Sequence, residues 1–105
     1  MTAAVKKRAP TADEQHELAR VASLTSLIAA LKAGGERSRE EFGALFARAQ
    51  RVLELDDVEV ARALHLSRPT VGRWARGESA PHALGRKPAL AWLARQATHK
   101  LAQHG

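Results

Sequence analysis

Cysteine is absent from this 105-residue chain, so neither a disulfide framework nor a thiolate metal site can form. Long apolar runs are absent too. No stretch of about 18 apolar residues occurs, and the first residues lack the apolar segment of a secretory signal. We therefore expect a soluble protein of the cytoplasm that has no membrane partner.

The sequence also lacks the signatures of common enzyme sites. Its five histidines are scattered, and no two lie at the i, i+4 spacing that places two metal ligands on one helix face. It contains neither a glycine-rich phosphate loop nor the glycine-serine turn that exposes a nucleophile. We expect no enzymatic activity, no metal and no cofactor.

Proline is scarce in the middle of the chain, where Pro69 is the only one between Thr11 and Ala80. Because proline disrupts helices and 45% of the residues are apolar, this composition favours helices packed around one core. The length suits a single domain. We predict an all-α fold, a compact bundle of about five helices.

Acidic residues are nearly absent from the second half of the chain. Residues 60–105 contain eight Lys and Arg against one acid, a balance of +7, whereas residues 1–59 contain nine against ten, a balance of −1. Such asymmetry suits a surface that faces phosphates, because neutralising each phosphate releases counterions. A basic protein whose cations are merely solvated would show the same balance.

The basic half begins with a pattern for two short helices joined by a tight turn. Asp56 and Glu59 form an acidic variant of the capping box, so a helix begins there. Residues 65–67 make the turn, and Ser67 is a suitable N-cap for the second helix. The apolar face of the first helix consists of Val60, Ala61 and Leu64.

The second short helix, expected from Arg68 to about Arg76, separates into two faces. Its buried side consists of Val71, Trp74 and Ala75. Its other side has three arginines and no acid, and consists of Arg68, Pro69, Gly72, Arg73 and Arg76. Gly77 then ends the helix in a left-handed conformation.

These residues resemble a known family. The pattern consists of Val60-Ala61, Leu64, Leu66-Ser67, Thr70-Val71, Arg73-Trp74, Gly77-Glu78 and Pro81. It is similar to the Cro/cI-type (XRE-like) helix-turn-helix of phage repressors, antitoxins and related bacterial regulators, and it covers roughly residues 40–100. Three positions depart from it. His65 replaces the usual turn glycine, Ala75 replaces a frequent Glu, and Asp57 replaces a Gln that often contacts the DNA backbone.

The resemblance implies a lambda-repressor-like DNA-binding domain whose second helix enters the major groove. The side chains expected at base edges are Arg68, Pro69, Thr70, Gly72 and Arg73. The side chains expected at phosphates are Ser67, Arg76, Ser79, Arg86 and Lys87. Arg73 is the strongest candidate because arginine pairs with guanine O6 and N7, whereas Ser67 is equally explained as a cap alone.

The family pattern further implies a homodimer that binds a palindromic operator in double-stranded DNA, within the bacterial cytoplasm or nucleoid. We therefore expect a sequence-specific transcriptional regulator that acts as a repressor. Two alternatives remain open. The chain could be an antitoxin that represses its own operon and binds a toxin through its N-terminal helix, or a structural domain that does not bind DNA.

Residues 1–35 precede the family pattern. We expect residues 1–10 to form a flexible basic tail, in which residues 6–8 could contact DNA. Residues 11–35 form an N-terminal helix that begins at a T-x-x-E capping box and ends at two glycines. Its apolar stripe either packs on the chain's own core or forms a dimer seam, which is the preferred alternative. The stripe consists of Leu18, Val21, Leu24, Leu27, Ile28 and Leu31.

Residues 36–105 form the predicted helix-turn-helix domain. A capping box at Ser38 and Glu41 begins its first helix, whose apolar face consists of Phe42, Leu45, Phe46, Ala49, Val52 and Leu53. Residues 82–87 are expected to form a loop, with Pro88 in the first turn of a final helix. Arg86 and Lys87 would then hold a phosphate at that helix N-terminus, or would simply be solvated. Trp92 covers the core edge or forms a subunit contact.

Overall fold

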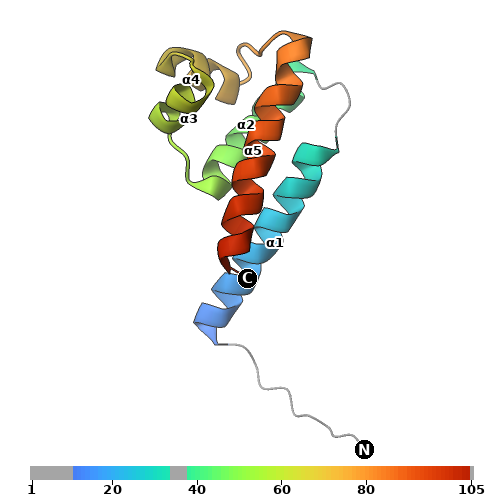
Figure 1. The fold of residues 1–105 in the computed structure, drawn as a ribbon, viewed down its shortest axis with the longest axis vertical. Helices are drawn as coiled ribbons and strands as arrows, with labels where there is room; N and C mark the ends of the chain where they lie inside the picture. The colour runs from blue at the N-terminus through green and yellow to red at the C-terminus, as the bar shows by residue number, and fades with distance from the viewer. Residues whose placement is uncertain (1–10, 34–37, 105) are drawn as a thin grey trace, which may run out of the picture.

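The computed structural model describes residues 11–33 and 38–104, which form helices without any strand (Figure 1). The helices are α1 (Ala12–Lys32), α2 (Arg39–Leu53), α3 (Asp57–Leu64), α4 (Arg68–Ala75) and α5 (Ala83–His104). The predicted all-α bundle of about five helices is confirmed. The predicted basic tail and the two glycines after α1 lie outside the described residues.

Three helices begin at the predicted capping boxes. The Thr11 hydroxyl accepts a hydrogen bond from the Glu14 backbone N–H at 3.1 Å, and the Glu14 carboxylate accepts one from the Thr11 N–H at 2.8 Å. Each box thereby satisfies two N–H groups that the first turn of a helix leaves without partners. The same reciprocal pair occurs at Ser38 with Glu41 and at Asp56 with Glu59.

Helix α1 packs on the same core as the rest of the chain. It runs alongside α5 in the opposite direction and also contacts α2 (Figure 1). Leu24 and Leu27 are fully buried and Leu31 nearly so, whereas Leu18 is 62% exposed. The preference for a dimer seam is therefore wrong for these three buried leucines, because α2 and α5 already cover them. Residues 11–33 and the helix-turn-helix share one hydrophobic core.

Helix α4 is fixed to α2 by aromatic packing and by a close backbone approach. The Trp74 ring meets Phe42 and Phe46 edge-on, with ring centroids 5.7 and 5.6 Å away. A Cβ atom on Gly43 would lie 2.8 Å from both the Gly77 Cα and the Trp74 carbonyl oxygen. Position 43 therefore requires glycine, a role that sequence analysis did not identify.

Side chains from the two long helices, α1 and α5, cap the C-terminal end of α2. The Lys100 ammonium group of α5 donates a 2.7 Å hydrogen bond to the Leu53 carbonyl oxygen. Arg20 of α1 pairs with the Glu54 carboxylate at 3.3 Å. A cation at a helix C-terminus binds a free carbonyl and opposes the helix dipole.

Helix α5 begins five residues before the predicted start. The Gly85 and Arg86 N–H groups both donate to the His82 carbonyl oxygen, at 2.7 and 3.2 Å, so residues 83–87 of the predicted loop are helical. Pro88 lies inside the helix. It removes the donor that would pair with the Leu84 carbonyl, but Leu84 is 83% exposed and water can hydrate that region. Trp92 is half-buried and packs against the core.

Among the described residues, none of the helices combines the length and apolar character needed to cross a membrane. That part of the chain also holds no group of three or more side chains able to bind a metal ion.

Candidate nucleic-acid interface

The turn between α3 and α4 is built by two local interactions. His65 adopts a left-handed conformation with φ 58°, and its N–H donates to the Ala61 carbonyl oxygen at the end of α3. Ser67 then caps α4, because its hydroxyl accepts a hydrogen bond from the Thr70 N–H at 3.2 Å. His65, which stands where the family pattern usually has glycine, thus adopts the positive φ that the turn requires.

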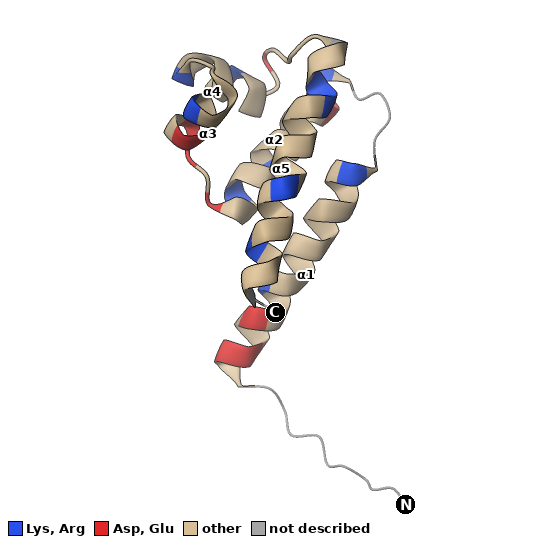
Figure 2. Cartoon of the chain, in the orientation of Figure 1, with Lys and Arg blue, Asp and Glu red and all other residues tan. Residues whose placement is uncertain are grey.

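The outer face of α4 is open to solvent at most of the predicted base-contacting positions. Arg68, Pro69 and Arg73 are exposed, and Thr70 is half-buried. On the opposite side of the helix Val71 is fully buried, and Trp74 is 9% exposed. Basic positions lie along α3, α4 and α5, with acidic positions at the start of α3 and after α4 (Figure 2).

A row of hydrogen bonds follows this face. The hydroxyl groups of Ser67 and Thr70 lie 2.8 Å apart, and an Arg73 guanidinium N–H donates to the Thr70 hydroxyl at 3.3 Å. These residues are spaced three apart, so their side chains are neighbours on the helix surface. The row ties the N-cap of α4 to Arg73, the strongest base-contacting candidate.

Gly72 does not lie on the open face as predicted. It is buried, and a Cβ atom there would be 3.1 Å from Arg76 Nη1 and 3.7 Å from Asp57 Oδ2. Position 72 points to the boundary where the start of α3 meets α4, and the Arg76 side chain covers it. In this structure Gly72 therefore does not offer backbone for a base contact.

Arg76, predicted to contact phosphate, is paired with an acid of the same chain. Its Nε lies 2.7 Å from Glu78 Oε2, and its Nη2 lies 3.4 Å from Oε1. The hydrogen bond that Arg76 donates to Glu78 raises the pKa of Arg76, and the same bond lowers the pKa of Glu78. As predicted, the arginine face of α4 contains no acid. The prediction did not take into account the Glu78 carboxylate, which follows the helix.

The remaining predicted phosphate contacts are not gathered at one helix end. Ser79 is half-buried in the loop after α4, and Lys87 is exposed on α5. The Arg86 side chain donates from Nε to the Pro81 carbonyl oxygen at 2.9 Å. Because α5 begins at Ala83, Arg86 and Lys87 are its fourth and fifth residues rather than the residues before its first turn, and their contact with phosphate stays a prediction.

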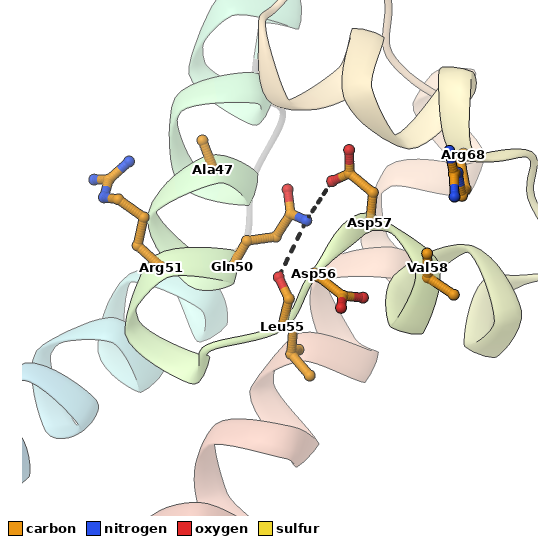
Figure 3. Close-up of a pocket in the computed structure, with 8 residues that line it drawn as sticks. All are labelled: Ala47, Gln50, Arg51, Leu55, Asp56, Asp57, Val58 and Arg68. Atoms are coloured by element: carbon orange, nitrogen blue, oxygen red, sulfur yellow. Dashed lines mark hydrogen bonds between the residues drawn. The ribbon is translucent and has the colours of Figure 1, made fainter.

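A shallow hollow of mixed charge borders α4 between α2 and the start of α3 (Figure 3). Gln50 holds the Asp57 carboxylate through a 2.9 Å hydrogen bond and also donates to the Leu55 carbonyl oxygen at 3.3 Å. Arg68 lies on the far side of the hollow from Gln50. Asp57 is thus fixed beside the candidate interface, where a carboxylate repels phosphate.

Comparisons of the chain with models of protein families, with curated proteins and with solved structures found no match.

Proposed function

We propose that this protein is a sequence-specific transcriptional regulator that binds double-stranded DNA with α4 in the major groove, in the manner of Cro/cI-type helix-turn-helix proteins. The observation that carries the proposal is the division of α4 into two faces. Arg68 and Arg73 are exposed on one side, while Val71 and Trp74 anchor the other side in the core. A helix fixed in this way can offer its arginines to another molecule without unfolding.

The dimensions and chemistry of α4 fit a groove. An α-helix with its side chains is about 10–12 Å across, and the major groove is about 12 Å wide, so a short helix such as the eight-residue α4 can enter it. Arginine pairs with guanine through two hydrogen bonds, which suits Arg68 and Arg73, and the Thr70 methyl group can contact a thymine methyl. The +7 balance of residues 60–105 supplies attraction to the backbone.

Repression and dimerisation complete the proposal. A regulator of this type binds two half-sites one helical turn apart, so a homodimer on a palindromic operator is expected. The first half of α1 is a candidate contact between subunits, since residues 12–19 are exposed and include Leu18. Its work would take place in the bacterial cytoplasm or nucleoid.

The antitoxin alternative depends on the apolar stripe of α1 as a surface for a toxin. Leu24, Leu27 and Leu31 are occupied by contacts within the chain, which leaves Leu18 as the large exposed apolar side chain of the stripe. A toxin would have to displace α1 from α5 or bind elsewhere. The DNA-binding regulator therefore has the stronger support.

Selection of bound sequences from a random DNA pool by the full chain, at near-physiological salt, tests the proposal. We expect enrichment of symmetric sites with two half-sites. The Arg73→Ala variant should lose that enrichment, whereas Arg95→Ala, which removes an exposed arginine from α5, should retain it. Binding without any enriched sequence would contradict a sequence-specific regulator.

A further inference from the structure

The Arg76 guanidinium lies near two carboxylates. Glu78 accepts hydrogen bonds from its Nε and Nη2, at 2.7 and 3.4 Å. Asp57 of α3 approaches from the other helix, because its Oδ2 and Arg76 Nη1 both lie within 4 Å of the same point above Gly72. The cation at the C-terminal end of α4 is therefore neutralised within the chain.

Local backbone structure sets the position of Glu78. Gly77 adopts φ 75°, and its N–H donates to the Trp74 carbonyl oxygen at 3.1 Å. The Glu78 N–H then donates to the Arg73 carbonyl oxygen at 2.9 Å. These bonds form the turn that commonly ends a helix at a left-handed glycine, so Glu78 is held one residue beyond that glycine and within reach of Arg76.

The ion pair is nevertheless accessible. The side chains of Arg76 and Glu78 are 60% and 53% exposed, so water and salt screen their attraction. A phosphate can approach the same guanidinium from solvent. Replacing one anion by another at an exposed arginine requires no rearrangement of the fold.

We infer that Glu78 competes with DNA phosphate for Arg76 and thereby limits the affinity of the protein for DNA of any sequence. The inference rests on the proposed function and deepens it. Binding of duplex DNA exchanges the Glu78 carboxylate for a phosphate, and the lost ion pair offsets the attraction gained. Phosphate contacts carry no sequence information, so the competition lowers the affinity for all sequences by a similar factor and leaves discrimination between sequences to base contacts such as those of Arg68 and Arg73.

The experiment compares the full-length wild type with Glu78→Gln and with a matched control, Glu54→Gln. The control removes the same charge from another exposed pair, Arg20 with Glu54. The probe is a fluorescent random-sequence duplex about three helical turns long, titrated at several salt concentrations. We expect Glu78→Gln to bind about three- to tenfold tighter, with a slope of log K against log salt steeper by about 0.9, and Glu54→Gln to match the wild type.

The Arg76→Gln background provides the second arm. There the Glu78→Gln change should leave the salt slope unaltered, because no cation remains to be released. If the wild type binds the duplex and Glu78→Gln binds it with the same affinity and the same salt slope, the inference is overturned and the proposed function stands. Failure of every folded variant to bind the duplex would overturn the proposed function, and the inference with it.

Discussion

Gly43 and Gly77 touch backbone to backbone: a Cβ atom on Gly43 would lie 2.8 Å from the Gly77 Cα. This contact joins the first half of α2 to the turn that ends α4. The same turn carries Glu78, so the contact holds both α4 and the carboxylate that follows it against the core. Substitutions at position 43 therefore test whether the close approach determines how α4 is held.

Gly43→Ala should lower the free energy of unfolding by about 1–3 kcal/mol, because the added methyl group meets backbone atoms that cannot turn aside. Urea denaturation followed by circular dichroism measures the change. Gly72→Ala is the matched control. There the nearest atom is the flexible tip of Arg76, at 3.1 Å, so a change within about 1 kcal/mol is expected. Equal stabilities for the two variants would contradict the role of the backbone contact.

Lys100→Met should cost about 1 kcal/mol of stability, since it removes the hydrogen bond to the Leu53 carbonyl and the cation at the end of α2. Lys87→Met removes an exposed lysine from the same helix and should change stability little. Chemical denaturation of both variants checks the prediction. A larger loss at position 87 than at position 100 would show that the cap is unimportant.

Arg73→Ala should weaken binding to a selected operator by about 1–3 kcal/mol and relax the preference at one base pair. The reason is the loss of a guanidinium that can make two hydrogen bonds to one guanine. Fluorescence anisotropy with the operator and with single-base variants measures both effects. Uniform weakening on all sequences would instead assign Arg73 to phosphate contact.

The pH dependence of DNA binding should reveal the state of Glu78. Its hydrogen bond with Arg76 lowers its pKa, so the ionised carboxylate persists as the solution is acidified and is lost only when the pH falls through that lowered pKa. The affinity difference between wild type and Glu78→Gln should therefore persist from about pH 7 to about pH 5. Titrations at constant ionic strength measure it, and a difference that vanished within this range would contradict an ion pair at Glu78.

Features that depend on neighbours along the chain were predictable. The capping boxes, the cap at Ser67 and the left-handed Gly77 each arise from residues within a few positions of one another. The start of α5 was missed because Pro88 is typical of a first helical turn, yet it is also tolerated further inside near an exposed helix end. A local rule allowed both positions.

Features that depend on packing between helices were not predictable from the spacing. To predict where the apolar stripe of α1 packs, one would have to know that α5 runs alongside α1. To predict that Gly72 is buried, one would have to know the position of α3. Gly43 did leave a signal. A glycine inside an amphipathic helix costs stability relative to alanine, so its presence at position 43 was a reason to expect a close backbone approach there. The Arg76 and Glu78 pair was also present in the sequence, but its geometry depends on the turn at Gly77.

The hydrogen-bonded row from Ser67 through Thr70 to Arg73 has a consequence for entropy. A long arginine side chain normally samples many rotamers and loses that freedom when it docks. Here part of the freedom is already restricted before any partner arrives, so less entropy remains to be lost on association. The N-cap residue Ser67 thereby influences how readily Arg73, six residues later, finds its bound orientation.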